Sequence, residues 1–417
     1  MTRAISIGAI LLAYVLAARA CWHIHRPGWR AWAFAAVNLV AYIALAVFFA
    51  GGETELALVL CGAYVLLIVV SFAVMAAVSQ RVDWVAWVGF FFPILPLVLM
   101  KYLPFEWTGA LPQVHIPKQM LDVTIVGLSY MAFRLSHLVL EVRNGLVVRP
   151  SLAEYLGFAF FLPTMMVGPI NPYSVHQHSF AKPDLLAMPV GRCLLRILVG
   201  GVKCEFLGNL ANQISYAGLF LDGKPHRVID LAVAMVSYYL YLYWNFSGFC
   251  DIAIGVAGLI GIRVKENFNN PFAAKSIREY WNRWHITLSE YVRDVIFSPV
   301  SKLLVRRLGS ARANWAISMG ILAAFFVVGL WHGAERRYII WGLLQAAGLI
   351  VHHNYTVWLK RRLGPEGYRR YHDNRWIGVA GQLLTFGFVL GSLFVFANDN
   401  YVLGSALHSL GYDFWRR

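Results

Sequence analysis

Charged side chains are scarce in this chain of 417 residues. Asp, Glu, Lys and Arg together make up 14% of it, whereas about 25% is usual in soluble domains. Hydrophobic residues reach 59%, where about 45–50% is usual. Such an excess of apolar side chains requires a nonaqueous solvent, so the composition predicts an integral membrane protein.

Acidic residues are the scarcer of the two charge types. The chain has 21 Asp and Glu against 36 Lys and Arg, for a formal net charge of +15. A basic chain can bind nucleic acid, but here Lys and Arg lie between apolar runs, where the positive-inside bias of membrane proteins puts them. We therefore assign the charge to loops beside a membrane and set nucleic-acid binding aside.

Signals for disulfides, metal sites and nucleotide binding are missing. The five cysteines form no CxxC pair and lie mostly in apolar segments, so we expect free thiols packed in the core. No nucleophile elbow, GxGxxG motif or P-loop occurs. His352 and His353 are adjacent on an expected helix and point to different faces, which makes a poor metal site. We expect no metal and no bound cofactor.

Long apolar runs dominate what is present. About 20 apolar residues suffice to cross a bilayer, and we predict about ten or eleven such spans. The expected fold is an all-α polytopic membrane protein without a soluble domain, internal repeat or low-complexity linker. The runs are Ala4–Ala20, Ala31–Ala50, Leu56–Ser79, Trp84–Leu103, Leu121–Leu140, Tyr155–Val167, Leu194–Leu221, Val228–Ile260, Trp315–Trp331, Tyr338–Trp358 and Ile377–Ala397.

Three of these runs are unusual. Ala4–Ala20 could be a signal peptide processed after Ala18-Arg19-Ala20, but arginine fits such a site poorly, and we expect the run to be retained. Tyr155–Val167 is short and contains Pro163, so it is expected to break and re-enter the membrane. Val228–Ile260 is long enough for one steep helix and a broken return.

The Lys and Arg content of the loops sets the expected orientation. The second loop carries Glu53 and Glu55 and neither Lys nor Arg. The stretches from Arg263 to Arg307 and from Lys360 to Arg375 are strongly basic. Alternation of the spans then places these basic stretches in the cytosol and both termini on the exterior side.

A charged stretch from Glu266 to Asp294 separates two apolar runs. Its aromatic and apolar residues recur near helical spacing, which predicts a helix from Ser276 to Asp294 lying in the membrane interface. This helix contains His285, which could orient a substrate or a second histidine. The apolar run that follows ends in that second histidine, His332, 47 residues further on (332 − 285).

His332 ends an apolar run, where a histidine has few water partners and must be paired or functional. The ordinary pKa of histidine, about 6.5, suits proton transfer at neutral pH, and a buried neutral imidazole is a base. Gly333 is expected to leave space beside the ring for a substrate. A structural histidine bonded to its surroundings is the alternative for both His332 and His285.

Asp251 and the segment of residues 163–170 are further candidates. A carboxylate inside an apolar run marks a site by default, but a buried ion pair of Asp251 with Arg263 or Arg283 is the simpler alternative. Residues 163–170, which include Pro169, form a broken apolar element that either lines a tunnel or merely re-enters the membrane.

Several segments resemble, in order and spacing, the signature blocks of the membrane-bound O-acyltransferase family. They are ENFNNPF from Glu266, YWNRWHITLS around His285 and GLWHG around His332, and the resemblance covers most of the chain. FRLSHLVLEVRNG (133–145) and FLPTMMVGPI (161–170) are most similar to the DltB-like branch, which moves D-alanine onto teichoic acids. SGFCDIAIG (247–255) leans toward the alginate O-acetylation branch.

The resemblance implies a ring of transmembrane helices around a thin centre that holds a tunnel or funnel. It implies one domain over residues 1–417, with peripheral helices in 1–120, a catalytic core in about 121–397 and an exterior tail in 398–417. His332 matches the family's catalytic histidine, and His285 matches its second conserved position. The residues expected to support the site or line its tunnel are Trp284, Trp331, Asn282, Arg283, Gly333, Asp251 and Pro169.

The resemblance also implies a reaction. A cytosolic thioester donates an acyl group, D-alanyl or a similar one, to a hydroxyl on the exterior side. The expected donor is a phosphopantetheine thioester on an acyl carrier protein, or acyl-CoA, attracted by the basic loops. The expected acceptor is an envelope polymer or a membrane-anchored or periplasmic partner protein, at the bacterial cytoplasmic membrane. Acetyl transfer to an exported polysaccharide is the alternative.

Two other classes of protein stay open at this point. A transporter or flippase also has ionisable residues and broken helices within the membrane. A noncatalytic scaffold would leave both histidines dispensable. We favour the enzyme because no inverted repeat is visible and the histidines fall at signature positions.

Overall fold

The structure is a computed structural model that describes residues 2–50, 53–78, 84–102, 127–183, 189–219 and 226–398. Within these residues the elements are helices, apart from one isolated bridge between Phe268 and Trp284, and this confirms the all-α fold. Five of the described helices are long and apolar enough to cross a membrane. They are α2 (Pro27–Ala50), α3 (Thr54–Val78), α14 (Val228–Ile260), α18 (Ala313–His332) with the turn before it, and α20 (Arg375–Ala397).

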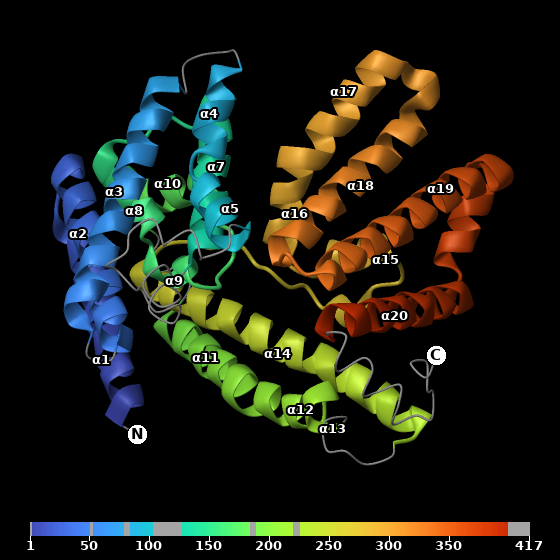
Figure 1. Ribbon diagram of the computed structural model, residues 1–417, viewed down its shortest axis with the longest axis horizontal. Coiled ribbons are helices and arrows are strands. Elements are labelled where there is room, and N and C mark those ends of the chain that lie inside the picture. Colours follow the sequence, from blue (N-terminus) through green and yellow to red (C-terminus); the bar gives the residue numbers. More distant parts are fainter. Residues whose placement is uncertain are drawn as a thin grey trace. The chain divides into compact units, whose positions relative to one another are not determined.

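Contacts group the residues into two compact units, labelled by their helices in Figure 1. Unit 1 comprises Met1–Gly200 and Phe249–Lys265, and unit 2 comprises Gly201–Gly248 and Glu266–Arg417. The helix α14 contributes to both. We describe each unit by itself. Of the tail expected at 398–417, residues 399–417 lie outside the described residues.

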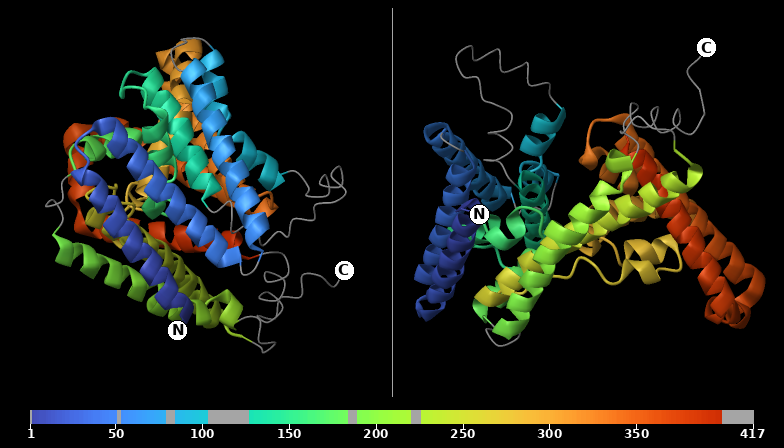
Figure 2. Two further views of the ribbon diagram at one scale, coloured as in Figure 1. Left: turned by 90° about the vertical axis from the view of Figure 1, so that its left-hand side faces the viewer. Right: turned by 90° about the horizontal axis from the view of Figure 1, so that it is seen from below.

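Unit 1 begins with α1 (Thr2–Ala20), which packs along α2, and α2 packs in turn along α3 (Figure 2). The run Trp84–Leu103, expected as one span, forms two helices instead, α4 (Val85–Phe91) and α5 (Leu95–Tyr102). Pro93 lies in the turn between them, because proline removes a helical hydrogen bond and clashes with the preceding turn.

The run Tyr155–Val167 breaks as predicted. Helix α8 (Leu152–Ala159) ends before Pro163, which lies in the first turn of α9 (Leu162–Met165), where its missing N–H costs no hydrogen bond. Arg134 of α7 (Leu128–Arg143) donates to the carbonyl of Ala159 (2.8 Å) and to Oγ1 of Thr164 (2.7 Å). A buried arginine therefore satisfies the backbone at this break. Helix α10 (Tyr173–Ala181) follows it.

Helix α14 has the predicted bounds but is a single unbroken helix of 33 residues, so the broken return is wrong. The sequence places no proline inside it. Its length of about 50 Å exceeds the roughly 30 Å hydrocarbon core of a bilayer. The run before it, expected at Leu194–Leu221, is α11 (Val190–Gly201), a π-helical segment (Val202–Gly208), α12 (Asn209–Gln213) and α13 (Tyr216–Leu219).

In unit 2, three helices that follow one another in the sequence pack against their neighbours (Figure 1): α17 (Ser298–Leu308) packs against α18, and α18 packs against α19 (Arg336–Asp373). Helices α18 and α19 approach closely because Gly342 has no side chain: a Cβ atom there would lie 2.5 Å from the carbonyl oxygen of Phe325. Helix α19 kinks at Gly364, which has a φ of 65° and is followed by Pro365.

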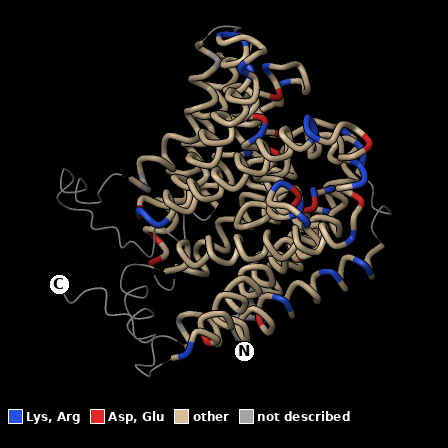
Figure 3. Tube along the Cα trace, turned by 90° about the vertical axis from the view of Figure 1, so that its right-hand side faces the viewer, with Lys and Arg blue, Asp and Glu red and all other residues tan. Residues whose placement is uncertain are grey.

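Charge is distributed as the sequence predicts. Lys and Arg gather at helix ends and connections, while long stretches of helix carry no charge (Figure 3). Arg306 and Arg307 lie in the last turn of α17. The five cysteines are free and buried, which confirms the prediction of core thiols.

Candidate active site

The stretch expected as one helix from Ser276 to Asp294 is two helices separated by a turn. Helix α15 (Ile277–Trp281) ends before the turn, and α16 (Ile286–Val292) begins after it. The single interfacial helix is therefore wrong. His285 has a φ of 46°, in the left-handed region, which a right-handed helix excludes and which few residues other than glycine adopt.

The side chain of Asn267 holds His285 in this conformation. Its Oδ1 accepts hydrogen bonds from the backbone N–H (3.1 Å) and the hydroxyl (2.9 Å) of Thr287 and lies 3.2 Å from Nδ1 of His285. Its backbone carbonyl accepts the N–H of Ile286 (3.0 Å). Asn267 and His285 are both buried, so a network of satisfied hydrogen bonds fixes the histidine.

These contacts assign the tautomer of His285. Because Oδ1 of Asn267 accepts, Nδ1 of His285 carries the hydrogen, and Nε2 keeps its lone pair. Nε2 is buried and has no hydrogen-bond partner among the residues that the structure describes. Burial, and then the nearby His332, lower the pKa of His285 below its ordinary value, so the ring is neutral at pH 7. Nε2 of His285 can therefore accept a hydrogen bond from a substrate group.

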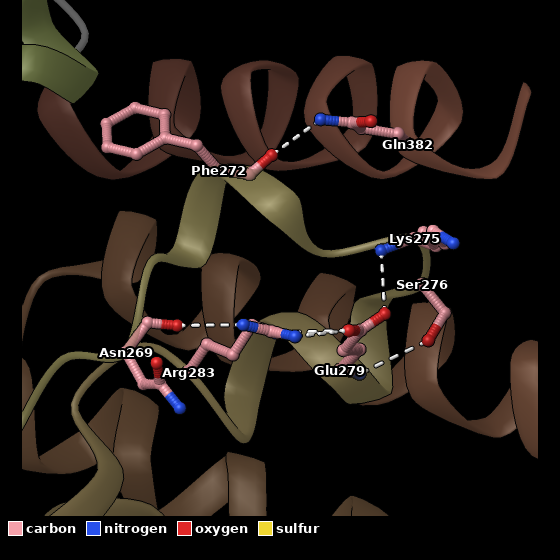
Figure 4. Close-up of polar contacts among 7 residues, drawn as sticks. All are labelled: Asn269, Phe272, Lys275, Ser276, Glu279, Arg283 and Gln382. Atoms are coloured by element: carbon pink, nitrogen blue, oxygen red, sulfur yellow. Dashed lines mark hydrogen bonds and ion pairs between the residues drawn. The ribbon is translucent and has the colours of Figure 1, made fainter. Parts of the chain in front are cut away.

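Arg283 and Glu279 brace the turn (Figure 4). Arg283 donates from Nε (3.0 Å) and Nη2 (2.8 Å) to one carboxylate oxygen of Glu279, and from Nη1 to the carbonyl of Asn269 (3.0 Å). The N–H of Lys275 donates to the other oxygen (2.9 Å). Burial alone would raise the pKa of Glu279, but the hydrogen bonds from Lys275 and Arg283 lower it, so the carboxylate is ionised. Arg283 therefore supports the turn.

Trp284 anchors the other side of the turn. Its backbone forms the bridge with Phe268, and its ring stacks on Tyr239 and Tyr280 at centroid distances of 5.5 and 5.7 Å. Because its ring is packed among these aromatic side chains, Trp284 is a structural support of the loop that carries His285.

His332 ends α18 inside a cluster of aromatic rings. Its ring lies 4.5 Å from Trp331, 5.1 Å from Trp341 and 4.9 Å from Phe396, centroid to centroid. Trp331 also packs edge-on against His285, at 6.4 Å. The structure therefore brings both predicted histidines and the predicted Trp331 together in unit 2.

The space beside Gly333 is not open. A Cβ atom on Gly333 would lie 2.6 Å from the ring of Tyr338, whose centroid is 6.1 Å from that of His332. The interpretation of Gly333 as room for a substrate is wrong, because the Tyr338 ring occupies that side. Glycine is needed there for the close approach of this ring.

Asp251 and Pro169 belong to unit 1, whereas both histidines belong to unit 2. Asp251 pairs with Nε of Arg196 at 2.9 Å. Arg283, one of the two partners expected for Asp251, is engaged by Glu279 instead. Pro169 is buried between α9 and α10.

A cavity of about 400 Å³ runs along α18 in unit 2. Val328, one helical turn before His332, lines its near end, and Ile317 lines the far end. At 1.5 Å per residue these positions lie about 6 Å and about 22 Å from His332 along the helix. The cavity therefore runs from beside His332 toward the basic connection of α17 and α18.

The cavity wall is apolar along α18 and mixed elsewhere, where basic side chains lie among apolar and polar ones. Arg278, Arg293, His352 and His353 line it, and no Asp or Glu does so among the described residues. His352 and His353 were expected to point to different faces, yet both reach the cavity. Asn282, expected in a tunnel wall, also lines it. In the part of the chain that the structure describes, no group of three His, Cys, Asp or Glu could hold a metal.

Sequence reasoning missed the residues that shape this site through packing. Trp341, Phe396 and Tyr338 lie in ordinary apolar runs, and no local signal distinguishes them from lipid-facing aromatics. Asn267 had a signal, because it lies inside the ENFNNPF block that carried the family resemblance.

Two histidines, one buried and one half-buried, thus lie close together among apolar helices. Residues 114–370 match MBOAT, the membrane-bound O-acyltransferase family, and the chain belongs to that family. It is therefore a multi-pass membrane O-acyltransferase.

Relatives with established names fall into two groups. The chain is 30% identical over 316 residues to the teichoic acid D-alanyltransferase of Bacillus subtilis (strain 168), covering 74% of this chain and 76% of that protein. It is 28% identical over 246 residues to the peptidoglycan O-acetyltransferase of Helicobacter pylori, covering 57% and 43%. It is 26% identical over 227 residues to the probable alginate O-acetylase AlgI of Pseudomonas aeruginosa, covering 54% and 42%.

Proposed function

We propose that this O-acyltransferase moves D-alanyl or a similar acyl group from a cytosolic thioester to a hydroxyl of an envelope acceptor on the exterior side. The observation that carries the proposal is the position of His332. It ends the helix whose side lines a cavity with basic side chains in its wall, so a chain-like donor in that cavity would reach it.

In the proposed reaction, neutral His332 takes the proton of the acceptor hydroxyl as its oxygen attacks the thioester carbonyl carbon. The C–S bond then breaks, and the departing thiolate takes the proton from the His332 imidazolium, so the products are an ester and a free thiol. General-base catalysis of this kind contributes about 10²–10⁴ in rate. Nε2 of His285, which keeps its lone pair, accepts a hydrogen bond from a donor group of the acceptor other than the attacking hydroxyl, and so orients the acceptor.

The cavity suggests the kind of donor. Its apolar stretch along α18 suits a pantetheine chain, and its arginine and histidine side chains suit a phosphate. Both a carrier-bound phosphopantetheine thioester and acyl-CoA carry this chemistry. We favour the carrier, because the greatest coverage among the three relatives above is with a D-alanyltransferase. Acetyl transfer to an exported polysaccharide is the second candidate, supported by the O-acetyltransferase relatives.

Loss of the gene is expected to remove one class of base-labile ester from the cell envelope. Mild alkali releases O-linked acyl groups, and chromatography then identifies them. Recovery of less D-alanine from the deletion strain, restored by the wild-type gene, supports the proposal. Loss of acetate instead supports the second candidate, and an unchanged ester content contradicts both.

Reversing the charge of Arg306 and Arg307 to glutamate is expected to raise the KM for a carrier-bound donor by about threefold or more, because charged surfaces steer association. Raising the salt should do the same to the wild type, since the screening length falls from about 10 Å at 0.1 M to about 3 Å at 1 M.

The matched control reverses the charge of Arg369 and Arg370, which lie near the C-terminal end of α19. It changes the net charge equally and, because this stretch is also basic, is expected to raise the KM less than the reversal of Arg306 and Arg307 does. If the KM changed neither when Arg306 and Arg307 are reversed nor when salt is added, electrostatic docking of the donor at the end of α17 would be contradicted.

A further inference from the structure

A buried amide links three helices beside the cavity. Gln345 of α19 is 2% exposed, and both ends of its side chain are used. Its Oε1 accepts the indole N–H of Trp281 in α15 (3.1 Å), and its Nε2 donates to Oγ of Ser392 in α20 (2.7 Å). Ser392 in turn donates to the carbonyl of Val389 (2.8 Å).

This chain of hydrogen bonds has a direction. An indole N–H only donates, so Oε1 of Gln345 faces Trp281 and Nε2 faces Ser392. If the amide of Gln345 were flipped, its NH₂ group would face the indole N–H of Trp281, and two donors would oppose each other. Gln345 therefore fixes the plane and position of the Trp281 ring rather than merely filling space.

The ring that Gln345 holds lies at the boundary between the cavity and the histidine. Trp281 lines the cavity and packs edge-on against Phe325 (4.9 Å) and Trp341 (6.1 Å). Trp341 packs edge-on against His332 at 5.1 Å. One further ring thus separates the indole of Trp281 from His332.

A leucine at position 345 could pack the three helices together without burying an amide. Burying an amide is unfavourable unless its hydrogen bonds are made, and an apolar pair of the same shape is often as stable. The amide therefore contributes a defined position of the indole, which packing by leucine would not supply.

We propose that Gln345 is a positioning residue that holds the indole of Trp281 as the inner wall of the donor cavity, so that the thioester stops beside His332. The inference rests on the proposed function. Without the hydrogen bond from Trp281 to Gln345, Arg278 and Arg293 still line the cavity. Donor binding is therefore retained, while the carbonyl carbon of the thioester is misplaced relative to His332.

The kinetic test uses Gln345→Leu in proteoliposomes with an acyl thioester donor. We expect kcat to fall about tenfold, which corresponds to about 1.4 kcal/mol, with KM for the donor within about twofold of wild type. Trp281→Phe keeps an aromatic ring but removes the N–H and is expected to lose a similar amount. The double variant should lose no more than either single variant, because both remove the same hydrogen bond between Trp281 and Gln345.

Thr385→Val is the matched control, since it removes a buried hydroxyl of α20 that donates to the carbonyl of Gly381 within the same helix (2.7 Å). It should keep wild-type kcat, and all variants should remain folded, as shown by cooperative melting in detergent. Full kcat in a folded Gln345→Leu protein, or losses that add in the double variant, would overturn the proposal.

A second readout needs no acyl transfer. Val328→Cys, in a background without the five natural cysteines, places a thiol in the cavity wall beside Trp281. Adding Gln345→Leu should change its rate of reaction with a small thiol reagent several-fold, whereas Thr385→Val should not. Equal thiol-reaction rates in all three proteins would overturn the positioning role of Gln345, and this readout does not depend on acyl transfer. Absence of acyl transfer by the wild type would instead contradict the proposed function.

Discussion

Replacing His332 with alanine is expected to abolish surface acylation and leave the protein folded. His332 lies one helical turn after Val328, which lines the cavity, and is only half-buried, so its removal takes away the proposed base without leaving a large hole in the core. General-base catalysis contributes about 10²–10⁴ in rate, and the loss should fall in this range. The measurement is ester-linked acyl at the cell surface, normalised to the amount of protein in the membrane.

The control for this prediction is His372→Ala, which changes an exposed histidine near the end of α19. It should keep full activity. Both variants should show wild-type membrane expression and detergent melting, which separates chemistry from folding. Activity above a tenth of wild type in His332→Ala would remove His332 as the base.

Filling the cavity is expected to have the next largest effect. Ala324 lies on α18 two turns before His332 and is 3% exposed, with its methyl group in the cavity wall. Ala324→Phe adds a ring to the passage, and kcat/KM for the thioester should fall by about 10²-fold, because a donor excluded from the cavity loses its oriented position beside the base. Ala324→Val should give a smaller loss, graded with volume.

Val327→Phe is the matched control, since Val327 is on the same helix but 41% exposed and outside the cavity. It should leave kcat/KM unchanged. Overpacking costs about 1–3 kcal/mol in a filled core, so the melting temperature of Ala324→Phe is measured as well. A folded Ala324→Phe protein with normal kcat/KM would show that the donor does not use this cavity.

The long helices could be predicted from sequence because length and apolarity alone determine them. Helices α2, α3, α18 and α20 begin and end within a few residues of the predicted runs, and α14 matches its predicted ends. The break between α4 and α5 was missed although Pro93 marks it. The prediction of one span relied on the apolar composition of the whole run and gave too little weight to this proline, which breaks helices.

The turn at His285 could not be predicted from local spacing. Residues 276–294 have helical periodicity, but Asn267, eighteen residues before His285, supplies hydrogen bonds that a continuous helix would lose. The partner of Asp251 was missed for the same reason, because Arg196 is 55 residues away along the chain. Long-range contacts of this kind override local propensity.

For the site, sequence blocks predicted the two histidines and Trp331, and the structure brings these three rings together. The blocks did not predict the cavity, because its wall combines residues of α15, α16, α18 and α19 whose distances depend on packing. Gln345 was missed as well, since a single glutamine in an apolar run has no motif.

The most direct test of the account is a single-turnover reaction of the purified protein in proteoliposomes with a radiolabelled acyl thioester and a hydroxyl acceptor. The account predicts that the wild type forms one base-labile ester for each thiol released, and that His332→Ala forms none. Ester formed at the same rate by His332→Ala, or thiol released without ester, would contradict it.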